Sequence, residues 1–373
     1  LALAEAQARA RIRSRKADPT TPILHLLERA EREQATGWVP ILNDRISRIA
    51  DIDPDALNSA PAQARLLAAH AWARSPQTRE RATRAFARIA SEAGPWQAEA
   101  LWELGILERS SDTQASRAAA ADRFSTLALR FPDHPMASDA MAGAIALTED
   151  PAELLRLLTA ATEAFPDRPE IELWRYRMAE LSAGAARLDT LDRITAGTRE
   201  ATLALPLYAA TTEQLLTRDQ DPASRAALLE RAAAFFDQHK SPEATAWFGR
   251  AADATLDVNT QRALRLAERA IELEPNRDGT PGAQITAALA LIALDREPEA
   301  TERLVRVATA LGAAQDRSAI FWQSWTLLLE IAGPDDPASA RAHLARLELI
   351  DPDLGGDPWH RRLDTLRRGL GTE

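Results

Sequence analysis

Histidine side chains are the first candidates for chemistry in this chain, because imidazole binds metal ions and transfers protons. No two of the six histidines stand three or four residues apart, and the metalloprotease pattern H-E-x-x-H is absent. We therefore expect them to cap helices, to pack or to lie on the surface, and we predict neither a metal site nor a cofactor. The histidines are His25, His70, His134, His239, His343 and His360.

Two acidic stretches resemble the start of a calcium-binding loop. They read DIDPDA at 51–56 and DPDLGGD at 351–357. The first has no glycine for the sharp turn, and the second places Arg362 where such a loop needs a bidentate glutamate. We interpret both stretches as turns between helices.

The composition argues against several other classes of site. The formal net charge is −10, so the chain would be repelled by a phosphate backbone, and we predict no nucleic-acid partner. Without cysteine there is no disulfide, no thiolate metal site and no cysteine nucleophile. The sequence also contains no phosphate-binding loop, dinucleotide fingerprint or nucleophile elbow.

An all-α fold is predicted by the residue types that dominate the chain. Alanine, leucine, arginine and glutamate are strong helix formers, and no run of alternating apolar residues bounded by turns is present. The chain has 373 residues, which exceeds the roughly 100–200 residues of an ordinary domain. Either several domains or an array of repeats must account for that length.

A repeated phrase favours the array. FPDHP at 131–135 and FPDRP at 165–169 stand 34 residues apart. At five places, residues twelve, eight and five positions before a proline are apolar, and Asp or Asn follows that proline. The five sets are Leu42-Ile46-Ile49-Pro54, Ala120-Phe124-Leu127-Pro132, Leu154-Leu158-Ala161-Pro166, Ala263-Ala267-Ala270-Pro275 and Ala340-Leu344-Leu347-Pro352.

Each of these sets predicts the end of one helix and the start of the next. Spacings of four and three place the apolar residues on one helical stripe, and proline ends the helix because it has no N–H to donate. Asp or Asn then supplies a turn or a cap. The further helices that we expect span 58–73, 76–92, 96–109, 136–148, 170–182, 203–217, 222–238, 243–256, 282–294, 297–311 and 317–331.

The expected helices pair into about nine or ten antiparallel hairpins. No long linker interrupts them, so we predict one continuous domain over 21–373, looser around 183–203 and 274–282 and closed by a capping helix at 358–370. Residues 1–20 read as a leader helix, or as a segment that follows a removed membrane anchor or signal sequence.

The repeat unit resembles the tetratricopeptide repeat (TPR) family, in divergent bacterial-type form. Its second-helix pattern is met at the five sets above, and the stretch LWELG at 101–105 matches the first-helix pattern. Units near 183–240 lack the Pro-Asp stop, and Arg250 stands where the family favours leucine. The resemblance implies a right-handed α-solenoid whose first helices line a concave groove.

In that family the groove holds a peptide or a partner helix, so the resemblance implies a non-enzymatic scaffold with a protein or peptide partner. In the family, fixed positions of the first helices face the groove. The residues at the matching positions of this chain are the candidate contact residues. They are Met136, Asp139, Gly143, Thr245, Phe248, Ala252, Trp322 and Trp325. Most other tryptophans are expected to wedge between hairpins; Trp102, Trp174 and Trp247 are the clearest examples.

Two other functions stay open from the sequence. An α/α-barrel carbohydrate-active enzyme would also be helical and rich in tryptophan, but it has long, irregular catalytic loops, and such loops are missing here. A purely structural spacer or self-assembly module is the other alternative. For localisation, the sequence leaves the bacterial cell envelope or periplasm and the cytoplasm open, with a possible membrane tether before Leu1.

Overall fold

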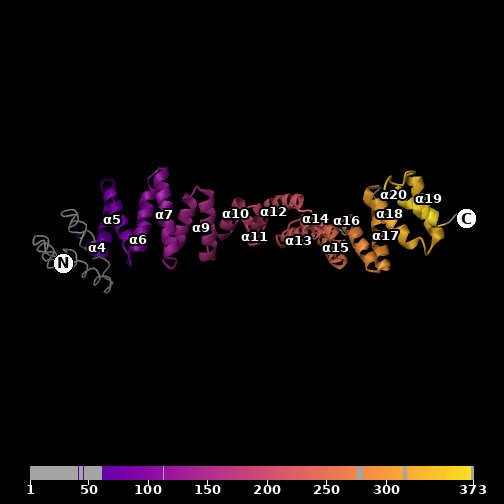
Figure 1. The fold of residues 1–373 in the computed structure, drawn as a ribbon, viewed down its shortest axis with the longest axis horizontal. Helices are drawn as coiled ribbons and strands as arrows, with labels where there is room; N and C mark the ends of the chain where they lie inside the picture. The colour runs from indigo at the N-terminus through magenta and orange to yellow at the C-terminus, as the bar shows by residue number, and fades with distance from the viewer. Residues whose placement is uncertain are drawn as a thin grey trace, which may run out of the picture. The chain divides into compact units, whose positions relative to one another are not determined.

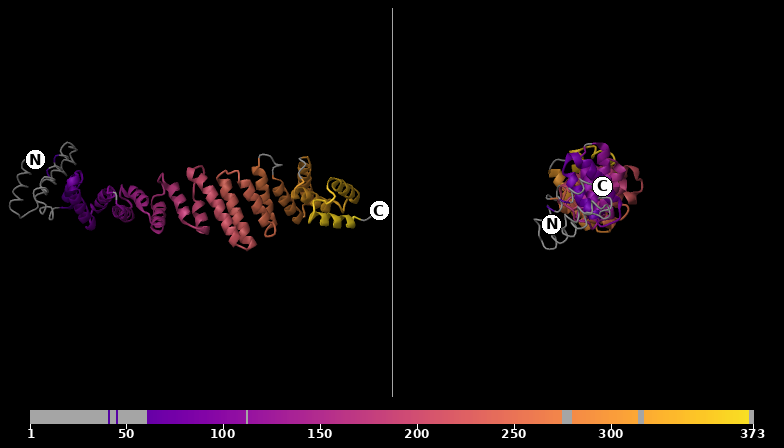
Figure 2. Two further views of the ribbon diagram at one scale, coloured as in Figure 1. Left: turned by 90° about the horizontal axis from the view of Figure 1, so that it is seen from above. Right: turned by 90° about the vertical axis from the view of Figure 1, so that its left-hand side faces the viewer.

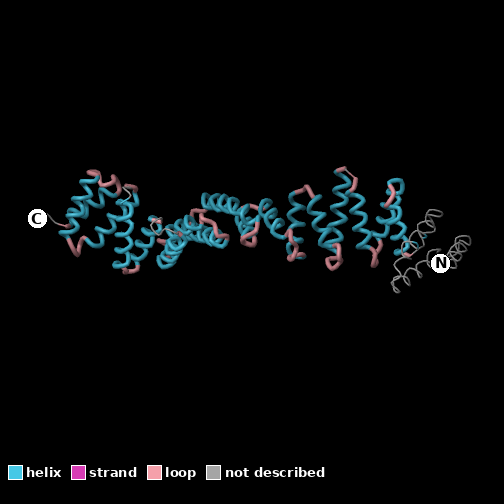
Figure 3. Tube along the Cα trace, turned by 180° about the vertical axis from the view of Figure 1, so that it is seen from behind, coloured by secondary structure: helices cyan, strands magenta, loops and turns pink. Residues whose placement is uncertain are grey.

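The computed structural model describes residues 41, 45, 61–111, 113–274, 280–313 and 317–370. In these ranges the chain forms 17 α-helices and a short 3-10 turn, and no strand is present (Figures 1 and 3). The prediction of an all-α fold is therefore confirmed. The chain divides into two compact units, one ending at Leu181 and the other beginning at Ser182.

Unit 1 is a row of helices in which each described helix contacts the next. Short connections make consecutive helices antiparallel, so they form hairpins of a first and a second helix. The elements are α4 (Ala62–Ala73), η2 (Pro76–Thr78), α5 (Arg79–Ser91), α6 (Gln97–Arg109), α7 (Gln114–Arg130), α8 (Ala137–Leu147), α9 (Pro151–Ala164) and α10 (Ile171–Leu181).

Unit 2 repeats this arrangement, as the row from α12 to α16 shows (Figure 2). Its first helices α14, α16, α18 and α20 also contact one another in succession, as stacked TPR-like hairpins do. The elements are α11 (Gly184–Leu191), α12 (Arg199–Arg218), α13 (Pro222–Gln238), α14 (Ala244–Thr255), α15 (Thr260–Leu273), α16 (Pro281–Ala293), α17 (Glu297–Ala313), α18 (Ala319–Ala332), α19 (Pro337–Ile350) and α20 (Trp359–Gly369).

The two repeated phrases adopt the same local structure. Phe131 (φ −130°, ψ 57°) ends α7 and Phe165 (φ −131°, ψ 59°) ends α9. Each phenylalanine donates its N–H to a carbonyl four residues back, and its own carbonyl accepts the N–H three residues ahead, from His134 or Arg168. The phrase is therefore a helix stop, as the sequence predicts.

The chain also contains a helix-start signal that was not predicted from the sequence. Three helices begin at an Asp-Pro pair in which the aspartate accepts the N–H three residues ahead and the proline takes the first helical position. These pairs are Asp150-Pro151, Asp221-Pro222 and Asp336-Pro337.

The divergent stretch holds more helix than we expected. Helix α11 lies inside 183–203 because Leu188, Leu191 and Ile194 are buried and fix a short helical turn. Helix α12 begins four residues before its predicted start, so Pro206 stands inside it on the exposed side. There the missing N–H costs one backbone hydrogen bond.

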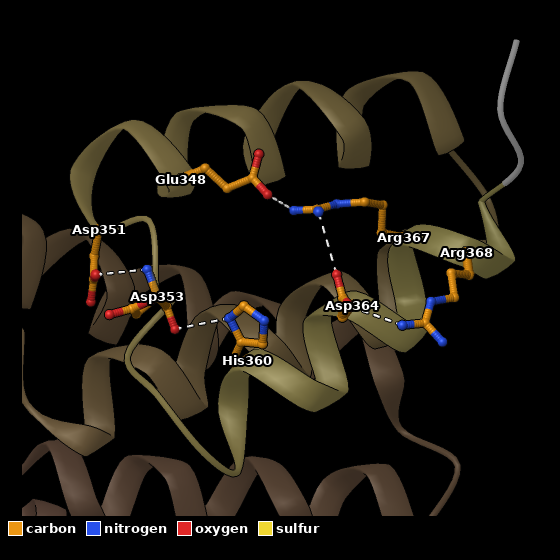
Figure 4. A network of polar contacts seen from close by, with 7 residues as sticks. All are labelled: Glu348, Asp351, Asp353, His360, Asp364, Arg367 and Arg368. Atoms are coloured by element: carbon orange, nitrogen blue, oxygen red, sulfur yellow. Dashed lines mark hydrogen bonds and ion pairs between the residues drawn. The ribbon is translucent and has the colours of Figure 1, made fainter.

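The stretch DPDLGGD forms a helix-to-helix turn (Figure 4). The Asp351 carboxylate accepts the N–H groups of Asp353 and Gly355, and the His360 Nδ1 lies 3.1 Å from the Asp353 carbonyl oxygen. Arg367 of α20 pairs with Glu348 of α19 and with Asp364. These polar groups hold α20 against the preceding hairpin.

Several predictions lie outside the described residues. They concern the segment 1–20, the repeat site at 42–55, and Pro275 with the residue after it. The single domain over 21–373, the total of nine or ten hairpins and the right-handed twist also stay predictions.

One aromatic ring locks the centre of unit 1. Phe124 of α7 is buried, and its ring lies against Gly105 of α6 and Gly143 of α8. A Cβ atom on Gly105 would lie 2.6 Å from the ring, and one on Gly143 would lie 3.2 Å from it. The ring therefore has no room to retreat, and glycine at 105 permits the close approach of the two helices.

We expect Gly105→Ala to lower the free energy of unfolding by about 1–3 kcal/mol, because the new methyl group overpacks the site. Gly249 on α14 is the matched control, since a Cβ atom there meets nothing within 4 Å. Gly249→Ala should raise stability by up to about 1 kcal/mol through helix propensity. Urea titration of both variants measures the difference, and equal stabilities would contradict the packing argument.

Candidate functional site

The candidate contact residues of unit 2 are largely enclosed. Phe248, Ala252 and Trp322 are buried, and Thr245 and Trp325 are half-buried. Trp322 lies on the backbone of Gly355, where a Cβ atom would approach its ring to 2.4 Å. Burial gives Phe248, Ala252 and Trp322 a packing role, so a partner would not reach them without moving a helix.

Helix α16 of unit 2 is buried on all sides in its middle part. Six consecutive residues, 283–288, are buried. Since a helix turns once in about 3.6 residues, six in a row cover every direction around its axis. The middle of α16 therefore offers no exposed side chain to a ligand.

Unit 1 presents an open first-helix face instead. We call it the α8–α10 face and define it by Met136, Asp139, Arg168, Glu170 and Leu173. Met136 precedes α8 and is 38% exposed, and Leu173 in the first turn of α10 is 42% exposed. Two large apolar side chains thus stand open to solvent on neighbouring hairpins.

Arg168 joins the two sides of this face. Its guanidinium donates to the Asp139 carboxylate at 2.9 Å, and its Nε lies 3.2 Å from Glu170 Oε2. Exposed ion pairs of this kind contribute about 0.2–1 kcal/mol each. Their larger effect is geometric, because one guanidinium ties α8 to the start of α10 and so holds the spacing between Met136 and Leu173.

Two of the five residues that define this face were among the predicted contact residues. Met136 and Asp139 were expected, whereas Gly143 turns out to be half-buried against Phe124. Shifting Met136 and Asp139 forward by the 34-residue repeat gives Glu170 and Leu173. The repeat therefore carried the missing signal, one unit further along the chain.

The described tryptophans pack within the fold. Trp174 and Trp247 are buried, and Trp102 is half-buried with its ring centroid 5.4 Å from that of Phe124. Arg250 stacks its guanidinium 4.6 Å from the centre of the Trp247 ring and pairs with Glu213. This stacking explains an arginine in a slot that the family fills with leucine.

A cluster of titratable side chains lies where α11, α12 and α13 meet, and in it Tyr208 is buried while the charged groups are partly or largely exposed. Arg231 pairs with Asp189 and Asp192, both at 2.6 Å, while Tyr208 is fully buried and stacks on Phe235 with ring centroids 3.9 Å apart. Burial and the Asp192 charge raise the pKa of Tyr208, so its phenol stays protonated.

His239 follows α13 and contacts the Phe235 ring at a centroid distance of 4.4 Å. Neither ring nitrogen has a hydrogen-bond partner in the described part of the chain. Burial lowers the pKa of His239, and the nearby Asp192 charge opposes that shift only in part. The imidazole is therefore held neutral.

Clefts open between some of the described helices. One of about 290 Å³ separates α7 from α9, one of about 540 Å³ lies between the end of α12 and helices α13 and α14, and one of about 390 Å³ lies between α15 and α17. None is lined by Tyr208 or His239. Among the described residues, no group of three or more metal-ligating side chains gathers.

Polar groups in the cleft beside α14 are already engaged. Arg225 donates to the carbonyls of Leu216 and Asp219 at the end of α12, where a cation is favoured by the helix dipole. Asp253 accepts a hydrogen bond from the Thr286 hydroxyl, and burial raises the pKa of Asp253.

In the ranges that the structure covers, no helix is long and apolar enough to cross a membrane.

Comparison with known proteins gives matches among solved structures only. No family model matches the chain, and no curated protein matches it in sequence. An assembly chaperone of RpL4 (Acl4, residues 1–338) is 17% identical with a TM-score of 0.22, and the match covers 74% of this chain and 99% of that one.

Two further solved structures cover more of the chain. A Rap protein complexed with competence and sporulation factor is 13% identical, covers 94% of this chain and 98% of its own, and has a TM-score of 0.24. Yeast Tom70 is 13% identical, covers 99% and 95%, and has a TM-score of 0.25. At TM-scores this low, the matches carry no argument about the present chain.

We expect acid to destabilise unit 2 through His239. Because its folded pKa lies below the unfolded value of about 6.5, the unfolded chain binds the proton first, and stability falls as the pH drops below that value. The loss ends at the lower pH where the folded imidazole also titrates.

His239→Gln removes this contribution and keeps a polar side chain. The difference in unfolding free energy between wild type and variant, measured by urea titration at pH 7 and pH 5, should shift in favour of the variant at pH 5. If the difference in unfolding free energy were the same at both pH values, His239 would titrate alike in the folded and unfolded states.

Proposed function

We propose that the protein is a non-enzymatic scaffold that binds a protein or peptide partner on the α8–α10 face. The observation that carries this proposal is the exposure of Met136 and Leu173 on either side of the Asp139–Arg168–Glu170 ion network. Large apolar side chains held at fixed positions are the usual anchors of a protein interface.

The energetics of these two anchors suit a specific contact. Full burial of an exposed methionine or leucine side chain contributes about 1.5–3 kcal/mol. Met136 and Leu173 have 38% and 42% of their surface left to bury, so each contributes part of that range. Little ordering is needed on this side of the interface, since Ala137, Ala140 and Met141 hold α8 in the core and Trp174 holds α10.

The geometry also restricts the partner. Met136 and Leu173 lie on successive hairpins, so a segment that contacts both must cross from one hairpin to the next. It needs two apolar side chains separated by polar or charged groups that tolerate the ion network. An amphipathic helix or an extended peptide meets that requirement.

Photocrosslinking tests the face directly. A benzophenone amino acid placed at position 136 or 173 should crosslink to one partner in extract of the source cells, whereas the same group at 203 or 305 should not. Leu203 and Val305 are the matched controls in unit 2, with exposures of 42% and 46%.

The affinity of the purified partner then quantifies the contact. Met136→Ala with Leu173→Ala should raise Kd at least tenfold, because both anchors are lost. Leu203→Ala with Val305→Ala should leave Kd unchanged. Equal affinities for the two double variants would refute binding on the α8–α10 face, while circular dichroism confirms that each variant is folded.

A further inference from the structure

Helix α19 carries the most exposed large apolar side chain among the described residues. Leu349 is 88% exposed, and its neighbour Ile350 is 49% exposed. Three exposed alanines precede Leu349 at successive spacings of three or four residues, so all four side chains lie on one side of the helix. We call this side the α19 stripe and define it by Ala338, Ala342, Ala345 and Leu349.

The same four positions carry charge on the other long second helices. The core-facing residues of each second helix repeat at spacings of four and three, and the stripe lies two residues before the first of them and two, five and nine residues after it. The first core-facing residues are Ala82 in α5, Ala120 in α7, Leu154 in α9, Leu229 in α13, Ala263 in α15, Ala300 in α17 and Ala340 in α19. Each of the other helices has at least one charged residue at the four positions, whereas α19 has none. Those charged residues are Glu80 and Arg84 in α5, Asp122 in α7, Arg156 and Glu163 in α9, Arg231 in α13, Arg265, Glu268 and Glu272 in α15, and Glu302 in α17.

Stacking of hairpins leaves these positions open to solvent. Each second helix from α5 to α17 is followed by a helix that packs against it, yet Arg84, Glu163 and Glu302 are exposed. A further hairpin behind α19 would therefore leave the stripe in water. A helix that covers the stripe has to approach from the solvent side.

The α19 stripe is complementary in shape to itself. It has one long apolar side chain at its C-terminal end and only methyl groups elsewhere. In an antiparallel pair of α19 helices, Leu349 of each copy lies on Ala338 of the other, and Ala342 faces Ala345. Alanine lets the two helices approach closely, so each leucine is packed against the other copy and removed from water.

The charges beside the stripe are complementary in the same arrangement. Arg341 and Glu348 are seven residues, or about two helical turns, apart and so lie on one edge of the stripe. A two-fold axis brings each edge beside the same edge of the copy, which leaves Arg341 and Glu348 of the two copies about 3 Å apart along the helix axes. Glu348 also pairs with Arg367 of its own chain, and 38% of its side chain stays exposed for a second guanidinium. The other edge brings Arg346 beside Ser339 of the copy, so no like charges meet there.

We propose that two copies of this chain associate through the α19 stripe as an antiparallel, two-fold symmetric helix pair. A stable specific interface takes about 20–30 residues from each partner, and α19 has 14 residues. The dimer is therefore weak and forms as the chain concentration rises. It uses no residue of the α8–α10 face, so it does not depend on the proposed function.

Sedimentation equilibrium of the full-length chain tests the association. From about 1 µM to about 1 mM, the average mass should rise from that of one chain towards that of two. Leu349→Gln should raise the dimer Kd at least tenfold, because a polar side chain replaces the apolar contact at both ends of the pair.

Leu129 of α7 is the matched control. It occupies the position of Leu349 and is 41% exposed, but Asp122 lies at another of the four positions of the same helix. Leu129→Gln should leave the dimer Kd unchanged, as should Met136→Ala with Leu173→Ala on the α8–α10 face. Circular dichroism verifies that each variant is folded.

Thiol cross-linking tests the direction of the pair, because the chain has no cysteine of its own. An antiparallel pair places position 342 opposite position 345 of the copy. An equal mixture of Ala342→Cys and Ala345→Cys chains, treated with a short bismaleimide, should therefore give the mixed cross-linked dimer above its statistical yield.

Three outcomes would overturn the proposal. A chain that stays monomeric throughout the concentration range would show that a second copy is not the occupant of the stripe. Dimers that persist equally in Leu349→Gln would place the association elsewhere on the chain. A merely statistical yield of the mixed cross-linked dimer would contradict the antiparallel pair.

Discussion

Each hairpin of this chain completes its core only against the next hairpin, and the rest of the structure depends on that constraint. Phe124 of α7 fills the space left by glycine on α6 and on α8, so three helices share one ring. In unit 2 Phe236 of α13 stacks on Trp247 of α14 with ring centroids 5.4 Å apart. A hairpin isolated from its neighbours would expose these rings to water.

In unit 2, ion pairs also fix how successive second helices are aligned along one another. Arginines on second helices reach acids about 32–42 positions earlier in the chain, on the second helix before them. Each pair contributes little energy because the groups are partly exposed, but a slip of one helical turn would break the whole series. The pairs are Arg231 with Asp189 and Asp192, Arg262 with Glu230, Arg269 with Asp237, and Arg303 with Glu268.

The sequence predicted local structure better than it predicted exposure. Helix ends at Phe131 and Phe165 follow from proline chemistry, which acts within a few residues and is readable from the chain. The exposure of a side chain depends on which neighbouring helices cover it. Phe248 and Trp322 were predicted to line a groove, but neighbouring helices bury them. Helix α11 was missed for a related reason, since only tertiary burial of its leucines stabilises so short a helix.

The contrast between α16 and the α8–α10 face follows from charge. Helix α16 carries no charged residue from Pro281 to Ala293, and many of its side chains are alanine, so neighbouring helices can enclose it at no electrostatic cost. Asp139 and Glu170 cannot be enclosed in the same way, because burying a carboxylate without full compensation is expensive. Arg168 compensates them at the surface and keeps that surface open. The charged side chains of the α8–α10 face stay in contact with water. Met136 and Leu173 beside them therefore also stay accessible to a partner.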